Sequence, residues 1–174
     1  ALPDLLSKAL GVSFDTNIGH DYIKDVAERY DFYHEQEERI SFDLDYFNRI
    51  TKGGLPNKTL NVALAGTGVG KSLFMCHVAA SAVTQGRNVL YITMEMAEER
   101  RAERIDANLL DVPIDQLENL SKPMFDQKMQ KLTDKGVGKL IVKEYPTGAA
   151  SSNNFRSLLK ELQVKRDFKP DLIC

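Results

Sequence analysis

The sequence has 174 residues, of which 43% are hydrophobic and 28% are charged, and its formal net charge is −2. These proportions are typical of a packed globular chain and exclude an extensively disordered one. A net charge so close to zero gives no overall attraction to nucleic acid, so any DNA contact must be local or must arise in an assembly.

The sequence shows no sign of a membrane span, of a signal peptide or of a metal site built from histidine and cysteine. It has no run of about 18 apolar residues that could span a bilayer, and its first residues lack the basic region of a signal peptide. Cys76 and Cys174 form no CxxC pair and fit a reducing compartment. His20, His34 and His77 lack metal-ligand spacing. We therefore expect a cytoplasmic protein without a resident metal cluster.

The beginning of the chain is predicted to be helical. Apolar residues repeat at helical spacing in three stretches, 2–10, 22–33 and 44–50. Residues 12–19 between the first two stretches are predicted to be a linker, and the third stretch stops at Lys52-Gly53-Gly54. We expect a linker helix with its linker over residues 1–19 and a helical lead-in over residues 20–57.

After residue 57 short apolar strands alternate with helices. The predicted strands cover 60–64, 89–93, 139–143 and 171–174. The predicted helices cover 73–83, 97–110, about 121–134 and 155–162. This alternation is typical of an α/β domain with a parallel sheet. We expect residues 58–174 to form such a core, and the last strand to be cut off as in a fragment of a longer protein.

A glycine-rich loop lies between the first predicted strand and the first helix of this core. It reads Ala65-Gly66-Thr67-Gly68-Val69-Gly70-Lys71-Ser72. Glycine permits positive φ and lets backbone N–H groups approach a polyanion, and the N-terminus of the following helix favours negative charge. Lys71 can pair with the β- and γ-phosphates, and the Ser72 hydroxyl can ligate Mg²⁺. The loop predicts a site for ATP with Mg²⁺, although Ala65 stands where the usual pattern has glycine.

A carboxylate directly follows the second predicted strand, in Met94-Glu95-Met96. The carboxyl ends of strands in an open α/β sheet face the ligand crevice, so Glu95 could accept a proton from an attacking water as the γ-phosphate leaves. Glu95 could equally cap the helix that begins near Ala97, because acidic residues are favoured there. The residues alone leave both roles open.

Several stretches together resemble the DnaB-type replicative helicases, most closely those of T4-like bacteriophages. The stretches are Asp43-Leu44-Asp45-Tyr46-Phe47-Asn48-Arg49-Ile50-Thr51-Lys52-Gly53-Gly54-Leu55, the loop from Ala65 to Ser72, Met94-Glu95-Met96, and Pro170-Asp171-Leu172-Ile173-Cys174. The resemblance implies a RecA-like P-loop core that works as a homo-hexamer on single-stranded DNA, with a primase and a helicase loader as partners, in the host cytoplasm.

The resemblance also assigns roles to single residues. It implies that Lys71 and Ser72 hold phosphate and Mg²⁺, that Glu95 is the catalytic glutamate, and that Arg104 lies near the nucleotide. The helix at residues 2–10 would dock on a neighbouring subunit. The aspartate that positions Mg²⁺, the DNA-binding loops and the arginine finger of the family would lie outside this sequence.

The sequence alone leaves two other functions open. The chain could be a recombinase-type or clock-type ATPase, because those proteins share the loop and the glutamate. It could also be an assembly module that binds ATP at a subunit interface without turning it over. For the isolated chain we expect the second behaviour, because it would lack the Mg²⁺ aspartate and the arginine finger.

Overall fold

The computed structural model describes residues 21–34 and 38–174, and the chain divides into two compact units between Glu37 and Glu38. In the first unit, helix α2 covers Val26–His34 and confirms the helix predicted within 22–33. The turn before α2 is held by Asp21, whose carboxylate accepts hydrogen bonds from the backbone N–H groups of Ile23 at 3.1 Å and Lys24 at 3.2 Å. The helix and linker predicted at residues 2–10 and 12–19 lie outside the described residues.

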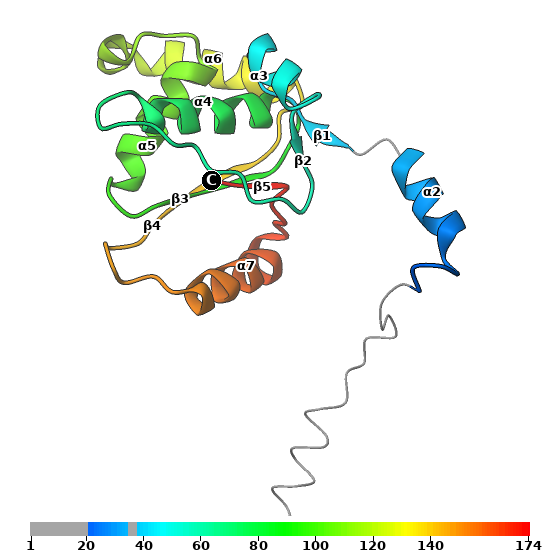
Figure 1. Ribbon diagram of the computed structural model, residues 1–174. Helices are drawn as coiled ribbons and strands as arrows, with labels where there is room; N and C mark the ends of the chain where they lie inside the picture. The colour runs from blue at the N-terminus through cyan, green and yellow to red at the C-terminus, as the bar shows by residue number, and fades with distance from the viewer. Residues whose placement is uncertain (1–20, 35–37) are drawn as a thin grey trace, which may run out of the picture. The chain divides into compact units, whose positions relative to one another are not determined.

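The second unit is an α/β layer structure (Figure 1). Its helices are α3 (Asp45–Ile50), α4 (Lys71–Thr84), α5 (Glu98–Leu109), the 3₁₀ helix η1 (Ile114–Asn119), α6 (Lys122–Asp134) and α7 (Ser152–Arg166). Its strands are β1 (Arg39–Ile40), β2 (Leu55–Pro56), β3 (Val89–Thr93), β4 (Leu140–Glu144) and β5 (Leu172–Ile173). In Figure 1 the helices α4, α5 and α6 lie on one side of the sheet β4-β3-β5, and α7 lies on the other.

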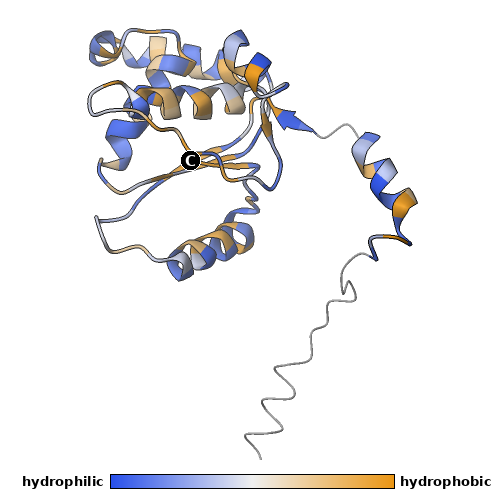
Figure 2. Ribbon diagram, in the orientation of Figure 1, coloured by the Kyte–Doolittle hydropathy of each residue, from blue (hydrophilic) through white to orange (hydrophobic). Residues whose placement is uncertain are grey.

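The three-stranded sheet is parallel and has the order β4-β3-β5. Neighbouring side chains on a strand point to opposite faces, so β3 supplies both cores. Tyr91 belongs to the core that α4 and α5 cover, whereas Leu90 packs with Leu162 of α7 and with Phe168. The strands are mainly orange in Figure 2, as expected for a sheet covered on both faces. The predicted α/β fold, a parallel sheet flanked by helices, is confirmed.

Helix α4 is the centre of the larger core. Ala79 and Ala82 are 0% exposed and Val83 is 3% exposed, and these small side chains let α4 lie close to the sheet and to α5. Burying a side chain such as that of Val83 contributes about 1.5–3 kcal/mol. The prediction of a buried helix holds for the C-terminal half of α4, because Leu73 near its start is 58% exposed.

The strand predicted at residues 60–64 is wrong. This segment forms no strand, and Leu60, Val62 and Leu64 are 91%, 78% and 93% exposed. A strand needs a neighbour with free backbone groups. β3 is already paired on both edges, by β4 and β5, and β5 pairs over only two residues. Residues 60–64 therefore have too few free backbone groups on a neighbouring strand with which to pair.

A two-stranded antiparallel pair, β1 with β2, was not predicted. Each strand has only two residues, which is too short for a periodic signal. Gly54 makes the pairing possible, because its φ is +127° and an added Cβ would lie 2.1 Å from the carbonyl oxygen of Ile40. Gln85 then joins this pair to the end of α4 through two hydrogen bonds with the backbone of Ser41, at 2.9 and 3.2 Å.

Residues 38–57 thus belong to the same compact unit as the parallel sheet. The three-part division of the chain at residues 19 and 57 stays a prediction about domain organisation. No helix within residues 21–34 or 38–174 is long and apolar enough to cross a bilayer.

Candidate nucleotide-binding site

The glycine-rich loop leads directly into α4. Gly68 and Gly70 have φ values of +75° and +103°, and Gly70 is the last residue before the helix. A Cβ added at either position would meet no atom within 4 Å, so the backbone conformation and not the space demands glycine. A phosphate-binding loop needs unpaired amides, which a continuous helix or a hairpin would not leave free. This loop is neither a continuous helix nor a hairpin.

The loop's backbone N–H groups are free to bind an anion. Among the hydrogen bonds of residues 38–174, none is donated by the N–H of Gly66, Gly68 or Gly70, and the helical bonding of α4 begins with Phe74 N–H donating to the Gly70 carbonyl at 2.9 Å. Free N–H groups at a helix N-terminus, together with the helix dipole, favour a negatively charged ligand.

Lys71 closes the loop on itself. Its ammonium donates to the carbonyl oxygens of Ala65 at 2.7 Å and Gly66 at 2.8 Å. These acceptors are neutral, so the ammonium charge is not compensated by a carboxylate, and a phosphate oxygen would be the stronger acceptor. The Ser72 hydroxyl, on the next residue, has no hydrogen-bond partner within the described part of the chain, so it is available as a ligand.

A pocket of about 1010 Å³ opens beside the loop. Ala65, Val69, Gly70 and Lys71 line one part of it, and residues 55–64, β5 and the first turns of α4 line much of the rest. Its volume is comparable to the upper end of the range for ligand pockets, about 300–1,000 Å³. Glu95 and Arg104 are not among the residues that line this pocket.

Glu95 sits in a closed turn at the end of β3 and is exposed. It makes no hydrogen bond or ion pair with another described residue, and the N-cap of α5, Ala97, has no side-chain cap. The sequence also allowed Glu95 to cap α5, but the structure shows no such cap. The structure leaves the carboxylate free, which a base needs, and does not bring it into contact with Lys71 or Ser72.

Arg104 lies on α5 and lines a separate pocket of about 410 Å³. The same pocket contacts Leu73 and Phe74, which follow Ser72 directly on α4. Arg104 thus lies beside the first turns of the helix that carries Ser72, one helix away from the loop itself. Its role near a nucleotide stays a prediction.

Arg101, on the same helix as Arg104, is buried. It is 6% exposed, and its guanidinium carbon lies 5.6 Å from the centre of the Tyr91 ring. Its Nε and Nη1 atoms have no hydrogen-bond partner in the part of the chain that the structure describes. Burial raises the pKa of Tyr91, whereas the positive charge of Arg101 acts in the opposite direction. The helical spacing of Arg101 and the buried Ile105 was the available signal that this arginine faces the core.

Comparison with known proteins identifies the family of the chain. A family model described as an AAA domain matches residues 27–149. The chain belongs to the AAA domain family. It is also similar to a DnaB-like replicative helicase of Enterobacteria phage T4, at 48% identity over 176 residues. That alignment covers 99% of this chain and 37% of the phage protein, so the chain spans less than half the length of this relative.

These matches confirm the resemblance to DnaB-type helicases and support the RecA-like P-loop core. The AAA domain match begins within α2, at residue 27, and includes the whole loop and Glu95. The loop and the turn after β3 therefore lie within the part of the chain that the family shares.

Proposed function

We propose that this chain binds ATP with Mg²⁺ and is the first part of the motor domain of a replicative DNA helicase. In the full-length ring, a homo-hexamer, this domain hydrolyses ATP to move along single-stranded DNA and to unwind the duplex. The observation that carries the proposal is the loop, whose amides are free and whose Lys71 ammonium is held at the start of α4. The similarity to the phage T4 protein supports a helicase over other ATPases that share the loop.

Each residue of the site has a distinct role in this proposal. The amides from Ala65 to Gly70 bind phosphate oxygens, Lys71 pairs with the β- and γ-phosphates, and the Ser72 hydroxyl ligates Mg²⁺. Bound Mg²⁺ neutralises charge that develops on the phosphates. Glu95 accepts the proton of the attacking water. Arg104 contacts the nucleotide from the side of α5.

The isolated chain is proposed to bind ATP without turning it over efficiently. Glu95 and Arg104 do not line the pocket beside the loop, so the proposed catalytic groups are not gathered around one cavity. A net charge of −2 also argues against strong DNA binding by this chain alone.

Contacts with single-stranded DNA, primase and a helicase loader in the cytoplasm are proposed for the full-length protein. An unwinding assay on forked DNA separates a helicase from a recombinase-type or clock-type ATPase.

Replacement of Lys71 tests the binding site. Lys71→Ala removes the ammonium that hydrogen-bonds to the loop, so we expect ATP binding with Mg²⁺ to fall by at least about tenfold in isothermal calorimetry. Lys135→Ala, at an exposed position after α6, is the matched control and should bind like the parent. A Lys71→Ala protein with the parent's affinity would refute the proposed site.

A further inference from the structure

The turn that carries Glu95 is closed at its base by a buried threonine. Thr93 is 3% exposed, and its hydroxyl donates to the carbonyl of Met96 at 2.9 Å while accepting from the Met96 N–H at 3.2 Å. Met94 and Glu95 therefore lie in a tight turn between two hydrogen-bonded residues. The path of the backbone at Glu95 is fixed from within the turn, although its carboxylate has no described partner.

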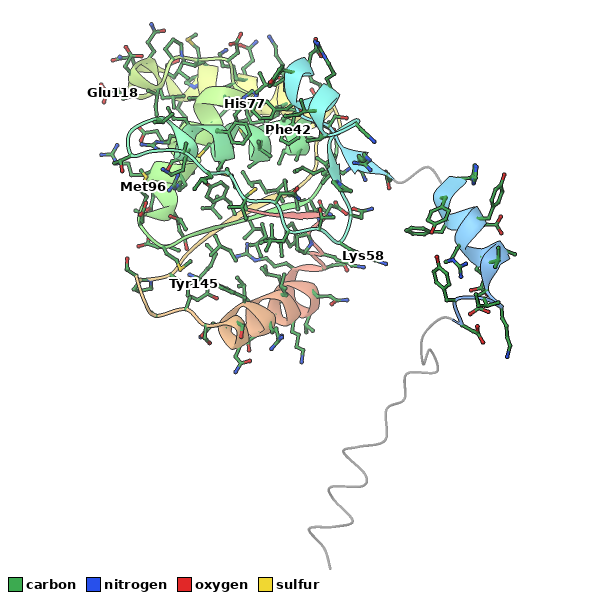
Figure 3. All side chains as sticks on the ribbon, in the orientation of Figure 1. Phe42, Lys58, His77, Met96, Glu118 and Tyr145 are labelled. Carbon is green, nitrogen blue, oxygen red and sulfur yellow. The ribbon has the colours of Figure 1, made fainter. Side chains whose placement is uncertain are left out.

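The segment after β4 holds the same turn from outside. β3 and β4 pair in parallel up to Thr93 and Glu144, and beyond that pair Tyr145 N–H donates to the carbonyl of Thr93 at 2.9 Å. The Thr147 hydroxyl donates to the carbonyl of Met94 at 2.7 Å. Both residues before Glu95 are thus bound by residues 145–147, and Figure 3 shows Met96 and Tyr145 near the same end of the sheet.

A third attachment comes from the residue at the start of α5. One carboxylate oxygen of Glu98 accepts from the backbone N–H of Glu144 at 2.8 Å and from the Lys143 ammonium at 3.2 Å. The hydrogen bond from Glu144 N–H and, after it, the interaction with Lys143 lower the pKa of Glu98. Glu98 is therefore ionised at neutral pH and fixes the chain three residues after Glu95.

From these contacts we infer that Glu98 and Thr147 are positioning residues, which fix the backbone from which the Glu95 side chain projects by tying its turn to residues 143–147. This inference rests on the proposed role of Glu95 as the base. A base must be within hydrogen-bond reach of the proton that it takes, and small displacements reduce the rate steeply. Turnover then depends on the connection between β4 and α7 as well as on the phosphate loop.

The exposed position of Thr147 separates positioning from general stability. Thr147 is exposed, so its replacement by valine removes one hydrogen bond and leaves no cavity. Thr133 offers a matched control, because its exposed hydroxyl also donates to a backbone carbonyl, that of Met129, at 2.9 Å. Glu161 is the control for Glu98, because it pairs with Lys165 at 2.8 Å on the exposed surface of α7.

The test measures steady-state ATP hydrolysis in the full-length protein that carries this chain. We expect Thr147→Val and Glu98→Ala each to lower kcat by roughly 10- to 100-fold with KM changed less than about twofold, as for a misplaced catalytic group. Thr147→Ser keeps the hydroxyl and should restore the parent kcat. Thr133→Val and Glu161→Ala should leave both constants at the parent values, and Glu95→Gln should abolish turnover.

Hydrogen exchange in the chain itself gives a second measurement that does not need turnover. Thr147→Val should speed exchange of the Met96 and Tyr145 amides and leave that of Leu90, in the middle of β3, unchanged. Parent-like kcat in Thr147→Val and Glu98→Ala, with Glu95→Gln inactive, would overturn the positioning role alone. A raised KM with unchanged kcat, or unchanged exchange at Met96, would overturn it as well. An active Glu95→Gln protein would instead refute the base role that the inference assumes.

Discussion

The φ values of Gly68 and Gly70 and the two hydrogen bonds of Lys71 set the shape of the phosphate loop. The freedom of the glycines to take positive φ could be predicted from the sequence, whereas the hydrogen bonds of Lys71 to its own loop are seen only in the structure. Within the described residues, the hydrogen bonds of the Lys71 ammonium go to carbonyl groups of its own loop. The amides of Gly66, Gly68 and Gly70 are unpaired among the same residues. At this scale, the loop already has the donors that a triphosphate needs.

The burial of Arg101 was not predicted from the sequence. Arginines next to other charged residues on a helix usually face solvent, yet this one is buried against Tyr91 with two unsatisfied nitrogen atoms. A buried charge without hydrogen-bond partners costs free energy, and the interaction with the Tyr91 ring offsets only part of that cost.

Replacement of Arg101 tests this balance. We expect Arg101→Met to keep the free energy of unfolding or to raise it by about 1 kcal/mol, because a side chain of similar length fills the site without a charge. Urea unfolding followed by circular dichroism measures the change. Arg100→Met is the control, since Arg100 pairs with Glu103 on the surface and should change stability by less than about 1 kcal/mol. A loss of several kcal/mol in Arg101→Met would mean that the buried charge is a net stabilising group.

At the scale of elements, length and pairing decide which predictions succeed. The helices α4, α6 and α7 have 13 to 15 residues each, long enough for a helical pattern to be clear. The pair β1–β2 is too short to show a pattern, and the strand predicted at 60–64 lacks a neighbour. A sequence pattern reports which segments suit a strand, whereas pairing depends on edges that other segments leave free.

The contact between α5 and β4 through Glu98 predicts a pH dependence. The pKa of Glu98 is lowered below its ordinary value of 4.5 in the folded protein. An acid with a lowered folded pKa stabilises the protein above its unfolded pKa, and this stabilisation is lost as the pH falls through the folded value.

We therefore expect the parent to be more stable than Glu98→Gln at pH 7, by up to about 1 kcal/mol for an interaction at the surface. The difference should shrink as the pH falls below 4.5, the ordinary pKa of the group. Thermal unfolding of both proteins from pH 7 to pH 3 measures it. A difference that grows on acidification would contradict the ionised contact.

At the scale of the whole molecule, the predicted α/β fold is confirmed, whereas the assembly of the site could not be predicted. The loop predicts its ligand from local chemistry, and the strand–helix alternation predicts the α/β core. The places of Glu95 and Arg104 relative to the loop depend on distances between β3, α5 and α4, which no local pattern contains.

In the proposed site, the main-chain amides of the loop bind the triphosphate. The most direct measurement is amide hydrogen exchange of residues 66–70 in the chain, with and without ATP and Mg²⁺. We predict that ATP slows exchange at these amides, that adenosine does not, and that Lys71→Ala abolishes the effect. ATP binding that leaves these amides unprotected would contradict the account.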